Sequence, residues 1–298
     1  MKKIVSIIFA AFVAAPLFAQ TYSAMLQGSD PESFSLGAAT LARPANARSA
    51  GDNAAAMAIS GRKMAVGASY SMWSPKVVGS KIAGIGGWGK IGDKFAIGLD
   101  AKYAMGKPYD ITDELGWSEK QFAPKDINAN LGVSYAVIDG LSVGVSAKFV
   151  SSTLADKYSA TAFGADVSVA FRKGGLGAAI AVCNLGSSLR YGSSKETVAL
   201  PSMARAGVSY SIVGLTASAE VDYMFKGGLM AGLGLEYAIK DIAFIRAGYH
   251  YGDAEKAMPS FASVGLGVKF FGVELNAAYL LASPVLGNTM MFGAGYSF

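Results

Sequence analysis

The chain has 298 residues, of which 52% are hydrophobic and 16% are charged, and its formal net charge is +5. Soluble domains usually have about a quarter of their residues charged, so this composition favours a chain that faces lipid. The mild and scattered positive charge argues against a nucleic-acid partner.

Residues 1–19 have the layout of a secretory signal peptide. Lys2 and Lys3 precede the apolar run IVSIIFAAFVAAPLFA, which ends at the small residue Ala19. An N-terminal membrane anchor is the alternative, but the run is shorter than the roughly 20 residues that span a bilayer. No cysteine follows the leader directly, so we expect an exported protein without a lipid anchor.

Residues 20–62 differ from the rest of the chain because they are rich in Ala, Ser and Asn and show no period of two. The stretch AGDNAAAMAIS predicts a short helix, with Asp52 or Asn53 as its cap. We expect this segment to fill the lumen of the structure that follows it. A periplasmic tail is the alternative.

From residue 63 to the C-terminus, apolar residues recur with a period of two. In KFAIGLDAKYA, for example, Leu99 lies on an apolar face and Asp100 lies on the opposite face. Each segment has about 10 to 13 residues, which matches a tilted membrane strand. The pattern predicts about fourteen strands, at roughly 63–73, 80–91, 94–105, 126–138, 141–152, 160–172, 175–186, 202–212, 215–225, 228–239, 242–252, 259–270, 272–283 and 288–298.

The two faces of these strands differ in composition. One face is apolar with aromatic residues near its ends, and the other is dominated by Gly, Ser and Ala with an occasional ion. Small residues suit the interior of a closed barrel, and apolar residues flanked by aromatics suit lipid. Hydrocarbon permits no open sheet edge. The sequence therefore predicts an all-β, membrane-spanning, up-and-down antiparallel barrel over residues 63–298, with residues 20–62 as its plug.

The connections between the predicted strands are alternately short and long. Turns such as IGD, IDG and RKGG alternate with loops such as GKPYDITDELGWSEKQFAPK and GSSLRYGSSKETVALP. Short periplasmic turns and longer outer loops are typical of outer-membrane barrels. We therefore expect the last strand to return to the periplasm and to pair with the first. Its terminal Phe298 resembles the signal that such barrels present to their insertion machinery.

The inward face of the predicted strands carries basic and acidic residues in equal number. This balance argues against an ion-selective pore, which would show an excess of one sign. Unpaired buried charges cost several kcal/mol each, so we expect these ions to pair and hold the plug. A transport route along them is the alternative. The lumen-facing candidates are Asp100, Lys102, Lys148, Asp166, Arg172, Arg205, Glu220, Asp222, Glu236, Arg246, His250, Lys269 and Glu274.

Motifs for catalysis are weak in this sequence. We expect His250, the only histidine, to be a hydrogen-bonded interior residue rather than a catalytic base. We expect Cys183, the only cysteine, to be a small residue that packs in the interior. GIGGWG at 84–89 matches a dinucleotide-binding pattern, but no helix follows it. No nucleophile, base and orienting group share a face, so we expect no enzyme activity, cofactor or metal.

The loop from Met105 to Asp126 carries Tyr109, Trp117 and Phe122 among charged residues. An exposed loop of this length with three aromatics is a candidate for contacting a ligand or a protein. The alternatives are residues of the interfacial belt and a loop that packs on itself.

Three stretches of the chain, NLGSSLRYGSSKETVALPSMARAGVSYS, IRAGYHYGD and LGNTMMFGAGYSF, together resemble the PorV/PorQ family of Bacteroidetes outer-membrane proteins. The first resembles the family's N-L-G, Tyr, L-P and R-x-G-x-x-Y run, and the other two are similar to its later strands. SLGAATLA and GDNAAAMAIS are similar to its N-terminal block, although the usual N-P-A is absent. The resemblance implies a barrel related to FadL-like fourteen-stranded barrels. It also implies a link to type IX secretion, in which PorV-like barrels escort exported cargo.

Two functions from different classes are expected. The first is a plugged, partner-binding barrel whose outer loops hold a secreted protein or a secretion-complex subunit. It depends on the resemblance, the balanced lumen and the aromatic loop. The second is a FadL-like or porin-like transporter in which residues 20–62 gate a small, hydrophobic solute. In both, we expect contacts with outer-membrane lipid and with the barrel insertion machinery.

Overall fold

The computed structural model describes residues 22–112, 118–155, 158–192, 196–253 and 257–298. The expected signal peptide and Trp117 lie outside these residues. Within them, no helix has both the length and the apolar character that crossing a membrane requires.

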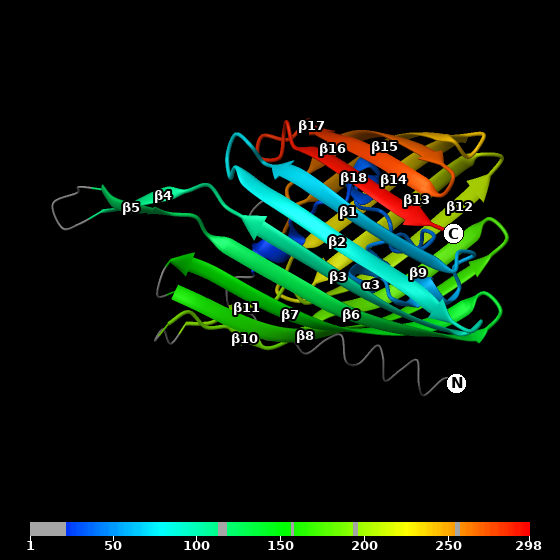
Figure 1. Cartoon of the computed structure of the whole chain (residues 1–298), viewed down its shortest axis with the longest axis horizontal. Helices are drawn as coiled ribbons and strands as arrows, with labels where there is room; N and C mark the ends of the chain where they lie inside the picture. The colour runs from blue at the N-terminus through cyan, green and yellow to red at the C-terminus, as the bar shows by residue number, and fades with distance from the viewer. Residues whose placement is uncertain (1–21, 113–117, 156–157, 193–195, 254–256) are drawn as a thin grey trace.

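Within the described residues, fourteen antiparallel strands form a closed barrel (Figure 1). The first strand pairs with the last, from Ala65 opposite Ser297 to Met72 opposite Met290. The predicted strand number and barrel closure are confirmed. The barrel strands are β1 (Met64–Trp73), β2 (Ser80–Ile91), β3 (Phe95–Met105), β6 (Lys125–Ile138), β7 (Leu141–Ala155), β8 (Tyr158–Lys173), β9 (Leu176–Gly186), β12 (Met203–Ile212), β13 (Leu215–Met224), β14 (Leu229–Ile239), β15 (Ala243–Gly252), β16 (Phe261–Phe270), β17 (Val273–Leu281) and β18 (Met290–Ser297).

Two regions that the sequence predicted as loops contain further strands. β4 (Tyr109–Thr112) pairs with β5 (Ser118–Phe122), and β10 (Ser188–Leu189) pairs with β11 (Val198–Ala199). The β4–β5 hairpin projects beyond the barrel wall (Figure 1). The loop prediction was wrong here because short antiparallel segments pair through their backbones without a long alternating pattern.

Side chains of the barrel strands point alternately to an exposed outer face and a buried inner face. On β3, Leu99 is 64% exposed, whereas Asp100 is 7% exposed. Outward residues are mainly Leu, Ile, Val, Tyr and Phe, which give the barrel an apolar exterior. Such a surface is favourable in hydrocarbon rather than in water, so the barrel spans a membrane.

Residues 22–62 lie inside the barrel and are called the N-terminal segment below (Figure 1). The helices of this segment contact the wall on two sides: α2 touches β15 to β18, whereas α3 and α4 touch β2, β3, β6 and β7. The segment contains η1 (Ser23–Leu26), α2 (Pro31–Ser35), α3 (Ser49–Asp52) and α4 (Ala55–Ala58).

The helix caps of the N-terminal segment differ from the sequence prediction. Asp30 caps α2 and accepts from the backbone amides of Glu32 and Ser33. Asp52 is instead the last residue of α3, and Asn53 follows it. The predicted capping role of Asp52 or Asn53 was wrong because α3 begins earlier than the pattern suggests.

Inward-facing glycines bring the N-terminal segment close to the barrel wall. A Cβ atom on Gly132 would lie 2.7 Å from the carbonyl oxygen of Ala50, and one on Gly67 would lie 3.0 Å from Ala47 Cβ. The segment therefore packs directly on wall backbone at these points. Atoms of the segment approach the wall in the same way at Gly86, Gly144, Gly232, Gly248 and Gly265.

Apolar clusters pack the N-terminal segment against the wall near both ends of the barrel. We call the end where β1 meets β2 the long-loop end, and the opposite end the short-turn end. At the short-turn end, Trp88 and Ala96 of the wall cluster with Ala50 and Met57 of the N-terminal segment. These contacts hold the segment against the wall near the short turns.

At the long-loop end, the inner face of the barrel is apolar. Its side chains cluster with Phe34 of α2, whose ring centroid lies 5.3 Å from that of Trp73. The expectation of a small, polar or charged inner face is therefore correct for mid-strand and wrong at this end, where the wall covers apolar atoms of the segment instead of water. The wall members are Trp73, Ile82, Met203, Met224, Met230, Phe261, Leu280 and Met291.

Candidate functional site

The inner face of β12 and β13 holds an ion cluster around Arg205. Arg205 lies opposite Asp222 in the strand register, and Glu220 is the next inward residue on β13. The Arg205 guanidinium lies 2.5 Å from Glu220 and 3.4 Å from Asp222. It also lies 2.7 Å from the carboxylate of Asp52 in α3. One cation thus joins two wall strands to the N-terminal segment.

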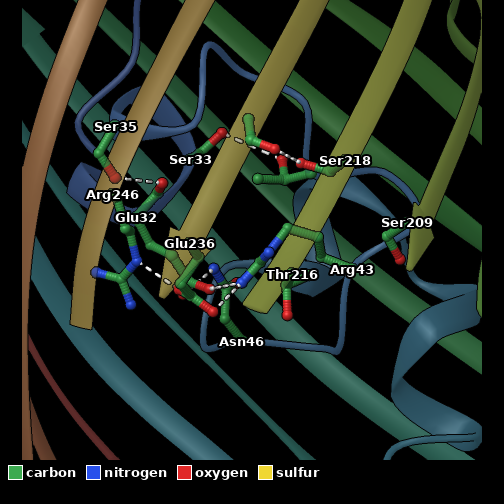
Figure 2. A network of polar contacts seen from close by, with 12 residues as sticks. Glu32, Ser33, Ser35, Arg43, Asn46, Ser209, Thr216, Ser218, Glu236 and Arg246 are labelled. Atoms are coloured by element: carbon green, nitrogen blue, oxygen red, sulfur yellow. Dashed lines mark hydrogen bonds and ion pairs between the residues drawn. The ribbon is translucent and has the colours of Figure 1, made fainter. Parts of the chain in front are cut away.

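A second ion cluster forms around Glu236 of β14 (Figure 2). Its register partner Arg246 on β15 lies 2.6 Å away, and Arg43 of the N-terminal segment also lies 2.6 Å away. Glu274 of β17 lies 3.5 Å from Arg246. Arg43 and Arg246 are only 6% and 2% exposed, so these pairs compensate for buried charge.

A third ion cluster occupies β3, β6, β7 and β8. Asp100 lies 2.9 Å from Arg48 of the N-terminal segment and accepts a hydrogen bond from Asn130 at 3.0 Å. Lys148 lies 2.7 Å from Asp166, within the wall. The wall charges are therefore matched partly by the segment and partly by one another.

Several wall side chains bind the backbone of the N-terminal segment directly. One of them, Glu220, also belongs to the ion cluster around Arg205. Lys102 donates to the carbonyl oxygens of Met25 (2.9 Å) and Gln27, Arg172 donates to that of Ala42 (2.6 Å), His250 lies 3.2 Å from that of Gly37, and Glu220 accepts from the amide of Leu41 (2.8 Å).

The structure places every predicted lumen-facing residue on the inner face of its strand. All of them except Lys269 take part in the contacts described above. Among the described residues, the Lys269 side chain forms no hydrogen bond or ion pair; it lies near the short-turn end of β16.

Charges of the N-terminal segment itself were missed by the sequence analysis. Arg43, Arg48 and Asp52 belong to the ion clusters. They lie in a stretch without strand periodicity, so the alternation of side chains along a strand cannot predict which way they point. The Asp30-Pro31 pair was a usable signal, because an Asp before a Pro marks a helix start.

The two acidic residues of α2 share one amide group. Asn46 Nδ2 donates to Asp30 at 3.2 Å and to Glu32 at 3.1 Å. Burial and the neighbouring Glu32 carboxylate raise the pKa of Asp30 to about 7. Burial also acts to raise the pKa of Glu32, but Arg246 and Arg43 outweigh it and lower that pKa. Asp30 therefore titrates near neutral pH, and Glu32 stays ionised there.

A cavity of about 230 Å³ lies between the N-terminal segment and the wall. Members of the ion clusters line part of it, including Asp100, Lys102 and Arg205. The apolar cluster of the long-loop end supplies the other part, because Phe34, Met203, Met230 and Met258 also line it. Methionine side chains are flexible and polarizable, so they adapt to ligands of different shape.

Cys183 and His250 line the same cavity. Cys183 is a buried free thiol. The His250 ring stacks on Phe261 with centroids 5.0 Å apart, and its Nδ1 faces the Gly37 carbonyl oxygen. Because a carbonyl oxygen only accepts hydrogen bonds, Nδ1 carries the proton. These are the contacts of interior packing residues.

Tyr109 and Phe122, two of the three aromatic residues predicted to bind a partner through the outer loop, contact each other. The rings of Tyr109 and Phe122 have centroids 6.0 Å apart, and the Tyr109 hydroxyl donates to the Leu154 carbonyl oxygen at 2.6 Å. These contacts fit the alternative in which the loop packs on itself. Partner binding by this hairpin stays a prediction.

No protein-family model and no curated protein matches the chain. Solved structures do match it. The toluene transporter TbuX of Ralstonia pickettii has a TM-score of 0.65 at 13% identity, with 91% of this chain and 98% of that chain covered. The toluene transporter TodX of Pseudomonas putida has a TM-score of 0.61 at 13% identity, with 95% and 99% covered.

A FadL homologue of Pseudomonas aeruginosa has a TM-score of 0.58 at 14% identity, with 95% of this chain and 97% of that chain covered. These similarities establish the fold: the chain has the same barrel fold as the FadL homologue and the two toluene transporters. They agree with the fold that the PorV/PorQ resemblance implied, whereas the narrower family assignment stays a prediction.

Proposed function

We propose that this protein is an outer-membrane transporter that passes small hydrophobic solutes through the barrel lumen. The observation that carries the proposal is the methionine-lined cavity beneath the long-loop end of the barrel. The likeness of the fold to toluene transporters supports it. The apolar exterior and the same likeness support a location in the outer membrane.

The cavity suits a compact, neutral molecule. Its volume is about 230 Å³, and an apolar cavity of roughly 150 Å³ is enough to bind benzene. Phe34, Met203 and Met230 provide apolar contacts for such a molecule. The arginines that line the cavity are already paired with carboxylates, so the site does not require a charged solute.

The N-terminal segment acts as the plug of this transporter. The clusters around Arg205, Glu236 and Asp100 attach it to the wall, and apolar contacts hold it near both ends of the barrel. A solute that enters the cavity therefore leaves it only when part of the segment shifts. The proposal takes the expected segment 20–62, of which the structure describes residues 22–62, as the plug and residues 63–298 as the barrel.

Uptake of radiolabelled toluene by cells that produce the protein tests the proposal. Met230→Trp on the inner face of β14 fills the cavity, so we expect uptake to fall to that of cells without the protein. Leu233→Trp is the matched control, because Leu233 lies on the lipid face of the same strand and is 59% exposed. Equal uptake by both variants and the unaltered protein would refute the lumen route.

Escort of exported proteins is a second candidate function. The β4–β5 hairpin favours it, because the hairpin projects beyond the barrel wall (Figure 1) and its own aromatic contacts stiffen it. A pull-down from outer membranes in mild detergent, followed by mass spectrometry, tests this candidate. Exported proteins or secretion subunits in stoichiometric amount would support it, and a barrel isolated alone would count against it.

A further inference from the structure

A second, smaller cavity lies in the lumen between the N-terminal segment and strands β1, β17 and β18. Its volume is about 60 Å³. This is room for about two water molecules, at roughly 30 Å³ each. Arg62, Ala65 and Ser297 line it, and Ala65 and Ser297 lie at the short-turn end of the barrel. The cavity therefore extends toward the short-turn end.

The lining of the smaller cavity mixes charged and polar side chains with apolar ones such as Pro31 and Ala65. It includes the carboxylates of Glu32 and Glu274, the guanidinium groups of Arg48 and Arg62 and the amide of Asn276. Polar groups of this kind hold water and small ions, and desolvating them against a hydrocarbon would be unfavourable. The smaller cavity is thus unsuited to the hydrophobic solute proposed above.

Asp30, Asn46 and Arg48 line both the smaller and the larger cavity. Asn46 Nδ2 donates to Asp30 at 3.2 Å, and Asn46 Oδ1 accepts from the backbone amide of Arg48 at 2.9 Å. These three residues therefore lie between the two cavities, and we call them the constriction below. Beyond the constriction, the larger cavity continues past Asp100 and Lys102.

The charge at the constriction is set by Asp30. Arg48 is neutralised by Asp100, which lies 2.9 Å away. Asp30 accepts hydrogen bonds from Asn46 and from two backbone amides, and within the described part of the chain it takes part in no ion pair. A carboxylate without a paired cation at a narrow point favours the entry of cations.

We propose that the closed barrel carries a narrow polar pathway for water and small cations, with Asp30, Asn46 and Arg48 as its constriction. The pathway runs from the larger cavity, past the constriction, through the smaller cavity to the short-turn end. It goes beyond the proposed transport of hydrophobic solutes, because it conducts while the N-terminal segment stays in place.

Ion conductance of the purified protein in planar lipid bilayers with potassium chloride tests the pathway. Gly295 lines the smaller cavity, and a Cβ there would meet the Val66 carbonyl oxygen at 3.2 Å and otherwise little. Gly295→Val therefore fills the cavity. We expect a potassium-selective conductance that this variant reduces to the level of protein-free bilayers. Phe292→Val, on the lipid face of the same strand and outside the lining of the cavity, should conduct like the unaltered protein.

Two more variants keep the pathway testable if Gly295→Val does not fold. Asn46→Ala opens the constriction and should raise the conductance several-fold. Asp30→Asn removes the charge and should reduce the preference for potassium over chloride. A folded barrel that does not conduct, or variants that leave conductance and selectivity unchanged, would overturn the pathway. Toluene uptake by the same variants reports the proposed function separately, because it does not depend on ion flow.

Discussion

Arg205 on β12 and Asp52 at the end of α3 lie 2.7 Å apart and join the barrel wall to the N-terminal segment. The same guanidinium also neutralises Glu220 and Asp222 of β13. The Arg205 and Glu220 side chains are 13% and 2% exposed, so these charges have largely left water and depend on one another. The attachment of the segment and the stability of the wall therefore share one cation.

Arg205→Ala should destabilise the protein strongly, because it leaves Glu220 and Asp222 buried without a cation. Removing one partner of a buried ion pair costs about 3–5 kcal/mol in the free energy of unfolding. Asp52→Ala should cost less, since the Asp52 side chain is 39% exposed and Arg205 keeps two carboxylates. Urea unfolding in detergent micelles measures both losses, and equal losses would contradict the shared role of Arg205.

Asp30 should make stability depend on pH. Burial and Glu32 raise its pKa from 3.8 to about 7, so the folded protein holds this proton more tightly than the unfolded chain. Its stabilising contribution is complete below about pH 4 and is lost as the pH rises through about 7.

Asp30→Asn tests this dependence, because Asn also caps a helix and does not titrate. Glu32 and Arg48 of the segment, with Arg62 and Glu274 around the smaller cavity, are the charged side chains that line this cavity with Asp30, and the variant leaves all four in place. We expect the variant to gain stability relative to the unaltered protein between about pH 5 and about pH 8. The free energy of unfolding of both proteins is measured across this range. A difference between them that does not change with pH would contradict titration of Asp30.

Gly132→Ala should loosen the packing of the N-terminal segment on β6. The added Cβ would lie 2.7 Å from the Ala50 carbonyl oxygen. Overpacking of this kind costs about 1–3 kcal/mol in the free energy of unfolding. Gly89→Ala on β2 is the control, because its Cβ would meet nothing closer than Met64 Cβ at 4.0 Å. A similar effect of both changes would argue against close packing at Gly132.

Leu233→Arg should be costly because Leu233 lies at mid-strand on the outer face of β14. Arginine at the bilayer midplane costs about 2–4 kcal/mol, whereas near the interface it costs about 0–1 kcal/mol. Leu215→Arg, at the short-turn end of β13, is therefore the control. Unfolding in lipid vesicles measures the difference, and equal costs would contradict the membrane placement.

The strands could be predicted from the sequence because lipid on one side and the lumen on the other impose a period of two. Leu99 and Asp100 show this contrast clearly. The β4–β5 hairpin escaped prediction because it has neither lipid nor lumen to impose a pattern. The lumen-facing candidates followed from strand parity alone, which fixes the direction of a side chain.

The partners of these residues could not be predicted. The pairing of Glu236 with Arg246 depends on the register between β14 and β15, and its contact with Arg43 depends on a segment without periodicity. The alternation of side chains along β12 and β14 was enough to place Met203 and Met230 on the inner face. They were overlooked because the inner face was expected to be small, polar or charged along its whole length.

A disulfide that locks the N-terminal segment to the wall tests the transport proposal most directly. Ser29 Oγ of the segment and Ser69 Oγ of β1 lie 3.0 Å apart, so Ser29→Cys with Ser69→Cys places two thiols within bonding reach. A Cys183→Ala background removes the natural thiol. We predict that cells with this variant take up toluene when the disulfide is reduced and fail to do so when it is oxidised. Equal uptake in both states, or none above that of cells without the protein, would contradict passage through a lumen that the N-terminal segment closes.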